Sequence, residues 1–266
     1  MALFNDLAGL PVFYPLFFLV ISFILGAVMG SALNCLAYRL AHNEKWEKGR
    51  SACPKCGHTL GILDLVPIFS YIFLGGKCRH CKSKISPRYL VTEVILAFAF
   101  ALITLFLGFS YNTVSALVLA GCLLALSLVD LEVQIIPDRF IIVPIIVRLV
   151  VLFLNGGFKG LIKGVIPAFI FGGALLVISL VMDKLLKKEA MGGGDIKLMF
   201  ALGLYFDIPQ CLLLLVIACI LGFVLAFILK AKKGEGFPFG PALSMAAFPV
   251  LLFGERLVAA YLNLFV

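Results

Sequence analysis

Long apolar runs alternate with shorter polar loops throughout this 266-residue sequence. Eight runs cover residues 12–37, 90–109, 113–129, 140–154, 161–182, 196–206, 211–229 and 241–266. The first has no charged residue and is long enough to cross about 30 Å of hydrocarbon at 1.5 Å per residue. The pattern predicts about eight transmembrane helices. The helix after Asp195 is short for a full span, so we expect its neighbours to shield it or a water-filled cavity to lie beside it.

Composition agrees with this pattern, because the chain is 63% hydrophobic and only 14% charged. Soluble domains use about 45–50% apolar residues, so the expected fold class is an all-α polytopic membrane protein. No basic residue precedes the first run and Asp6 is acidic, so the positively charged region of a cleaved signal peptide is missing. The first run is therefore interpreted as a retained helix.

The net charge of +8 is unevenly distributed. If the eight runs are helices, 18 of the 22 basic residues fall in loops on one side: residues 39–88, 130–139, 183–197 and 230–237. The positive-inside rule makes that side cytoplasmic and places both chain ends outside. Basic residues spread in this way reflect topology and contact with membrane lipid, so no nucleic-acid partner is predicted.

The loop over residues 41–89 is the only one large enough for a soluble module. It holds two C-x-x-C pairs, Cys53 with Cys56 and Cys78 with Cys81, with 21 residues between the pairs. This spacing is close to that of zinc ribbons, and four thiolates complete a tetrahedral zinc site. A loop this small has too little core to fold unaided, so a structural Zn²⁺ ion is expected on these four cysteines.

Other uses of these cysteines are disfavoured. A reducing cytoplasm disfavours disulfides, and a redox C-x-x-C would need a thioredoxin-like βαβ context that this loop lacks. His58 and His80 are spare ligands that four cysteines make unnecessary. The expected organisation is a first transmembrane helix at residues 1–40, the zinc module at 41–89 and a second transmembrane domain at 90–266.

Two aspartates lie at the ends of apolar runs on the cytoplasmic side. Asp195 follows three glycines at the start of one run, and Asp130 ends another. An acid beside hydrocarbon is costly and points to function, although Asp195 could also be an ordinary helix N-cap. Asp130 sits where an acid opposes the helix dipole, so a cap does not explain it. Asp138 is the rival partner for Asp195, but its position after Pro137 is typical of an N-cap.

Six short motifs occur in order along the chain. They are G-S-A-L-N-x-x-x-x-R-L at 30–40, D-x-x-P-x-x-S-Y at 64–71, I-S-x-R-Y-x-x-x-E at 85–93, D-x(6)-P-D at 130–138, G-x-G-D-x-K at 192–197 and P-F-G-P at 238–241. Together they resemble the motifs of the type IV prepilin peptidase family, also called prepilin leader peptidase/N-methyltransferases. Ala32 stands where that family often has Phe.

The resemblance implies an intramembrane aspartyl protease of the bacterial cell membrane, with Asp130 and Asp195 as the catalytic pair. The implied substrates are type IV prepilin or pseudopilin precursors, cut at the cytoplasmic face between a short leader and an apolar helix, typically after Gly. Many members also N-methylate the new terminus with S-adenosylmethionine. No G-x-G-x-x-G follows a strand here, so no residues that bind this cofactor can be named from the sequence.

Three other functions remain open at this stage. The chain could be a peptidase without methyltransferase activity. It could be a transporter whose paired acids relay protons, although transport favours polar residues in the middles of several helices, and these runs contain few. A zinc-bearing assembly scaffold would leave the two acids without a role.

Overall fold

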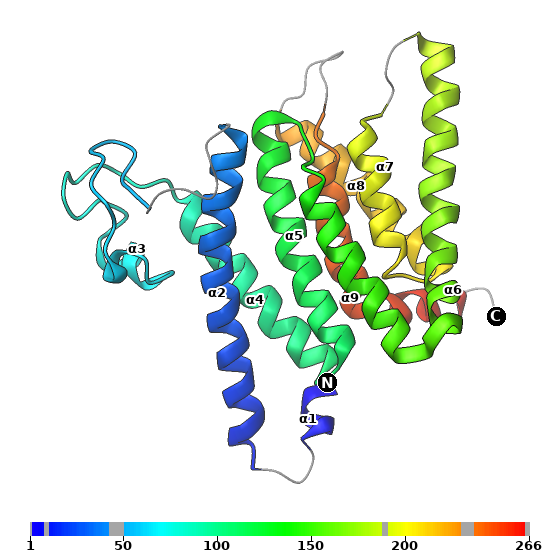
Figure 1. The fold of residues 1–266 in the computed structure, drawn as a ribbon, viewed down its shortest axis with the longest axis horizontal. Helices are drawn as coiled ribbons and strands as arrows, with labels where there is room; N and C mark the ends of the chain where they lie inside the picture. The colour runs from blue at the N-terminus through cyan, green and yellow to red at the C-terminus, as the bar shows by residue number, and fades with distance from the viewer. Residues whose placement is uncertain (1, 8–10, 43–50, 188–190, 230–236, 264–266) are drawn as a thin grey trace. The chain divides into compact units, whose positions relative to one another are not determined.

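The computed structural model of the chain describes residues 2–7, 11–42, 51–187, 191–229 and 237–263. The described residues form helices, with two isolated β-bridges and no strands. Six helices are long and apolar enough to cross a membrane (Figure 1), which confirms an all-α polytopic fold. Parts of the expected 41–89 module and of the run at 241–266, namely residues 43–50 and 264–266, lie outside the described residues.

The chain divides into two compact units, Met1–Thr113 and Val114–Val266. The first contains α1 (Ala2–Asp6), α2 (Phe13–Ala41), the 3₁₀ turn η1 (Ile62–Asp64), α3 (Phe69–Phe73) and α4 (Arg88–Leu107). The second contains most of α5 (Tyr111–Val133), and α6 (Arg139–Leu186), α7 (Gly193–Gly203), α8 (Ile208–Ile228) and α9 (Gly240–Leu262).

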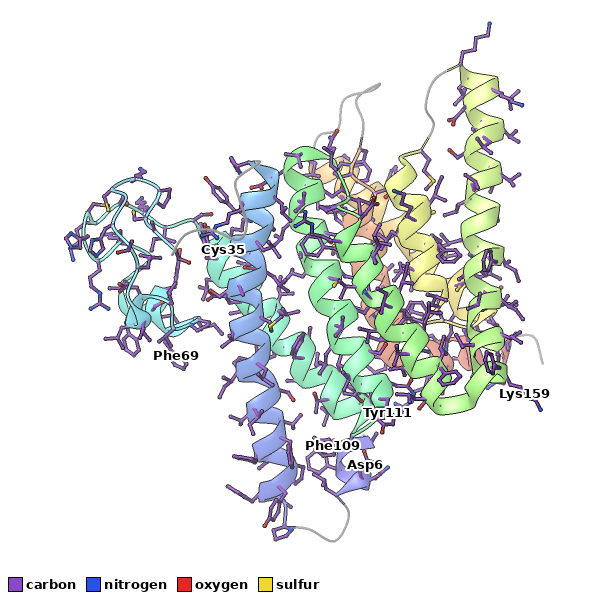
Figure 2. The ribbon with its side chains drawn as sticks, in the orientation of Figure 1. Asp6, Cys35, Phe69, Phe109, Tyr111 and Lys159 are labelled. Atoms are coloured by element: carbon purple, nitrogen blue, oxygen red, sulfur yellow. The ribbon has the colours of Figure 1, made fainter. Side chains whose placement is uncertain are left out.

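In the first unit, α2 and α4 pack as an antiparallel pair with their backbones almost in contact. A Cβ atom on Gly26 would lie 2.5 Å from the Leu96 carbonyl oxygen, and one on Gly30 would lie 2.9 Å from Glu93 Cα. Small residues four apart let membrane helices approach this closely, since van der Waals packing drives their association. At the other end of the pair, Asp6 on α1 accepts a hydrogen bond of 2.8 Å from the Phe109 backbone N–H (Figure 2).

In the second unit, α6 corresponds to the two apolar runs at 140–154 and 161–182. Its 48 residues contain one non-helical position, Gly157, with φ of 57° and ψ of −147°. The chain reverses direction there (Figure 1), so α6 supplies two of the eight expected apolar segments. A residue with a side chain would be strained in this conformation, whereas glycine adopts it freely.

The expected short segment is α7, whose 11 residues reach roughly 16 Å, about half of a hydrocarbon span. Its apolar side chains Leu198, Met199 and Leu202 are buried, and a Cβ on Gly203 would lie 2.5 Å from Ala168 Cα in α6. Neighbours therefore shield α7, as predicted. The turn that follows it also borders a pocket of about 240 Å³ whose lining includes the charged residues Arg148, Lys163 and Asp207.

Candidate active site and metal centre

The four cysteines of the first unit form one cluster. The Sγ atoms of Cys53, Cys56, Cys78 and Cys81 all lie within 4.8 Å of one another, and those of Cys53 and Cys81 are 3.9 Å apart. Four sulfurs placed tetrahedrally about 2.3 Å from a zinc ion would be separated by about 3.8 Å. The cluster can therefore hold a metal ion without large movement of the chain.

Two turns with the same hydrogen bonds build this cluster. The Cys53 N–H donates to the His58 carbonyl and the Gly57 N–H donates to the Cys53 carbonyl, each at 2.9 Å. In the second turn the Cys78 N–H donates to the Ser83 carbonyl at 2.8 Å, and the Lys82 N–H to the Cys78 carbonyl at 3.0 Å. The turns aim backbone N–H groups at sulfur, and those of Cys56 and Lys55 lower the pKa of the Cys53 thiol below its usual range. This favours the thiolate form that binds metal.

The histidines that the sequence left as spare donors lie outside the four-cysteine cluster, as does Asp64. His58 and His80 stack on each other with ring centroids 3.9 Å apart. Asp64 accepts hydrogen bonds from the Gly61 N–H at 3.2 Å and from Arg79 Nε at 2.7 Å. Asp64 therefore shapes the loop between the two turns.

Glu93 provides a contact that the sequence did not indicate. This carboxylate lies in α4, is almost fully buried, and accepts a hydrogen bond of 2.7 Å from the Ile68 N–H. Ile68 has φ of 65°, a left-handed conformation that a β-branched side chain disfavours. One side chain of α4 thus holds the cysteine-containing loop in a strained conformation.

The two predicted catalytic acids lie in the second unit, one near the C-terminus of a helix and the other near the N-terminus of another. Asp130 lies in the last turn of α5, and Asp195 is the third residue of α7, with Gly192 as the N-cap. Asp195 is therefore not the capping residue itself, although an acid in the first turn suits the helix dipole. Ile136 places the two acids in one region, because it lies against Gly194, which precedes Asp195, and against Gly240, which lies beside Asp130.

Both acids are buried and incompletely paired. Asp130 Oδ2 and Asp195 Oδ1 are shielded from solvent and have no hydrogen-bond partner among the described residues. A buried polar atom without a partner costs about 1–3 kcal/mol or more, so such an atom needs an explanation. Each of the two carboxylates has one such oxygen, which favours a site where a bound substrate or water supplies the missing hydrogen bonds.

Glycines allow the backbone to approach both acids. A Cβ on Gly240, at the start of α9, would lie 2.7 Å from Asp130 Oδ2. A Cβ on Gly194 would lie 2.9 Å from Ile136 Cβ, and one on Gly192 would lie 3.3 Å from Asp195 Oδ2. A Cβ on Gly193 would meet no atom within 4 Å. The open position falls at the variable residue of the G-x-G-D motif.

Asp138, the rival acid, is directed elsewhere. It occupies the N-cap position of α6, but its side chain makes no capping hydrogen bond. Instead Asp138 Oδ1 accepts a hydrogen bond of 2.7 Å from Lys197 Nζ, and both side chains are more than half exposed. Asp138 is thus the N-cap residue, as its position after Pro137 indicated, but its side chain bonds to Lys197 and not to the first turn of the helix.

Comparison with known proteins gives matches along most of the chain. Residues 24–107 match the sequence model of the bacterial peptidase A24 N-terminal domain, and residues 117–227 match that of the type IV leader peptidase family. No solved structure matches significantly.

Three relatives, each named prepilin leader peptidase/N-methyltransferase, illustrate the similarity. One from Neisseria gonorrhoeae is 31% identical over 85% of this chain and 87% of its own length. One from Pseudomonas aeruginosa is 31% identical over 94% of this chain and 95% of its own length. One from Aeromonas hydrophila is 32% identical over the full length of both chains.

Proposed function

Since the chain belongs to the type IV leader peptidase family, we propose that it cleaves the leader from type IV prepilin-like precursors with Asp130 and Asp195 as its catalytic pair. The relatives' shared name also assigns N-methylation of the cleaved product, with S-adenosylmethionine as the implied methyl donor. The observation that supports the acid pair best is the unpartnered, buried oxygen on each carboxylate.

In the proposed reaction, the two carboxylates share one proton because neighbouring like charges resist ionising together. The ionised carboxylate takes a proton from water, and the oxygen of that water attacks the scissile carbonyl carbon. The protonated carboxyl gives its proton to the carbonyl oxygen. When the tetrahedral intermediate collapses, the C–N bond breaks and the new amine receives a proton from one carboxyl of the pair. One hydroxyl of the intermediate returns a proton to the other carboxylate, so the carboxylic acid product leaves and the pair again holds one proton.

The scissile bond should lie where the substrate's apolar helix gives way to its polar leader. Backbone inside a helix is already hydrogen-bonded and must be unwound before attack. A glycine at the cut would ease unwinding, because it weakens a helix by about 1 kcal/mol relative to alanine. Gly240 lets the backbone at the start of α9 pack directly against Asp130, where a Cβ atom would lie 2.7 Å from Oδ2.

The cysteine cluster is proposed to hold one structural Zn²⁺ ion. A site closed by four thiolates has no open position for water, so its contribution is to fold the loop rather than to hydrolyse a bond. The proposed organisation keeps residues 1–40 as the first transmembrane helix, 41–89 as the zinc module and 90–266 as the peptidase domain. The basic loops orient the module and the acid pair toward the cytoplasm, in a multi-pass bacterial inner-membrane protein.

The decisive experiment measures cleavage of a prepilin-like substrate by purified full-length variants in detergent or nanodiscs. Asp130→Asn and Asp195→Asn should each lower the cleavage rate by about 10³-fold or more, and the double variant should be hardly slower than either. The matched control is Asp138→Asn, which should cleave normally because its side chain pairs only with the exposed Lys197.

Methylation of a precut substrate, supplied with S-adenosylmethionine, would show that the Asn variants are folded. If Asp130→Asn cleaves well beside a well-folded but inactive Asp138→Asn, the second member of the pair has been misassigned. A wild-type protein that does not cleave any prepilin-like substrate would contradict the proposed function as a whole.

A further inference from the structure

The cysteine-containing loop exposes an unusual amount of apolar surface. Five large side chains of η1 and α3 are well exposed: Ile62, Leu63, Phe69, Ile72 and Phe73. Of these, Ile62 and Phe73 each expose 84% of their surface. Single exposed apolar residues are ordinary, but these five lie on two elements that contact each other, and the rings of Phe69 and Phe73 stack with centroids 6.4 Å apart. The five side chains are called here the apolar edge.

The apolar edge is held at the level of the apolar part of α2. Ile68 lies between η1 and α3, and its N–H bonds to Glu93, which packs against Gly30 of α2. From Gly30 the helix continues for nine residues, or roughly 14 Å, before its first basic residue, Arg39. In the view of Figure 1, α3 likewise lies below the level at which α2 ends. Figure 2 labels Phe69 at this edge.

The rest of the loop carries the charge expected at a membrane surface. Residues 51–87 contain four lysines and one arginine against a single acid, Asp64. That acid is already bonded to Arg79, so the lysines are not neutralised by it. Lysines close to an anionic leaflet are attracted to its headgroups and strengthen attachment to the membrane.

We propose that the apolar edge inserts into the interface of the bilayer that α2 and α4 cross, with the lysines of residues 51–87 at the anionic headgroups. Interfacial segments bury apolar side chains about 5–10 Å into the boundary between headgroups and acyl chains. The edge meets this description because it combines apolar side chains, a fixed depth beside α2 and a basic surround. The occupant of the surface is therefore membrane lipid. This role does not depend on peptidase activity.

Depth-dependent fluorescence quenching tests the proposal in the full-length, metal-loaded protein. Phe73→Trp is made together with Trp46→Phe, which removes the chain's one native tryptophan. The protein is reconstituted into anionic vesicles containing lipids brominated at defined acyl positions. The matched control is Lys55→Trp in the same background, because Lys55 is exposed on the first cysteine turn and outside the apolar edge.

Acyl-chain bromines should quench the fluorescence of the Phe73→Trp protein at least about twofold more than that of the Lys55→Trp protein, with the strongest quenching from the shallowest bromines. Ile62→Trp, on η1 of the apolar edge, should behave like Phe73→Trp. Equal quenching of the Phe73→Trp and Lys55→Trp proteins would overturn the proposal. Blue-shifted emission from the Phe73→Trp protein that bromolipids do not quench would also overturn it, because another protein surface would then cover the edge.

Discussion

Two short turns bring the four cysteines together, whereas the contacts of Gly194 and Gly240 with Ile136 bring together two aspartates that lie 65 positions apart in the sequence. Each cysteine turn is closed by its own backbone hydrogen bonds. The acid pair has no such local support, because Asp130 and Asp195 end and begin different helices. Local sequence therefore builds the first site, while close contacts between helices shape the second.

Metal removal should produce the largest difference between the two sites, measured as susceptibility to trypsin. Stripping the protein with a strong chelator, or Cys53→Ser, should expose residues 51–87 to trypsin and increase cleavage there on the order of 10³-fold, because a small metal site folds with its metal. Fragments from the second unit should stay protected. Mass spectrometry of timed digests measures both regions.

Cys219→Ser is the matched control for this substitution, because Cys219 is an exposed cysteine of α8 that lies outside the cluster. It should leave the digestion pattern unchanged. If residues 51–87 resist trypsin equally with and without metal, the module does not depend on a metal ion.

Alanine substitution of the glycines should affect only the acid site. Gly194→Ala and Gly240→Ala would push Ile136 or Asp130 aside, and a shift of about 1 Å costs about 10²-fold in rate. Gly193→Ala should keep full activity, since its Cβ meets no atom within 4 Å. Steady-state kinetics of leader cleavage compares the three variants. Equal damage from Gly193→Ala and Gly194→Ala would contradict the packing explanation.

Substitution of Glu93 tests whether α4 holds the cysteine-containing loop. Glu93→Leu removes the acceptor of the Ile68 N–H and should weaken this attachment by about 1–3 kcal/mol. Glu93→Gln keeps an acceptor oxygen and should retain most of it. Hydrogen exchange of the peptide containing Ile68, followed by mass spectrometry, should be faster in Glu93→Leu only. Identical exchange in the two variants would show that the hydrogen bond does not anchor the loop.

The smallest effect is expected from Lys197→Met. Its ion pair with Asp138 joins the two acidic motifs, but both side chains are exposed, and such pairs contribute about 0–1 kcal/mol. Thermal unfolding and cleavage should therefore change little. A tenfold or greater loss of cleavage would mean that Lys197 acts on the substrate or on the acid pair.

The sequence predicted those features of the structure that depend on residues close together in the chain. The apolar runs located the helices, and the gap between the runs at 140–154 and 161–182 anticipated the reversal at Gly157 within α6. The cysteine spacing likewise predicted the cluster.

Contacts between distant residues could not be predicted in this way. The bond from Ile68 to Glu93 and the pairing of Asp138 with Lys197 depend on which helices become neighbours. The left-handed Lys82, which matches Gly57 in the other cysteine turn, carried no sequence signal because lysine does not favour that conformation.

The antiparallel contact of α2 with α4 also bears on how this chain can change in length. Because the two helices meet near Gly30 and Glu93, their packing already brings together the ends of the segment that joins them. The entropy of closing that loop grows slowly, by about 0.6 kcal/mol for each doubling of its length. Lengthening or shortening the segment between Ala41 and Arg88 therefore changes the stability of the helix pair very little. Domains of quite different length fit at the same place in the chain.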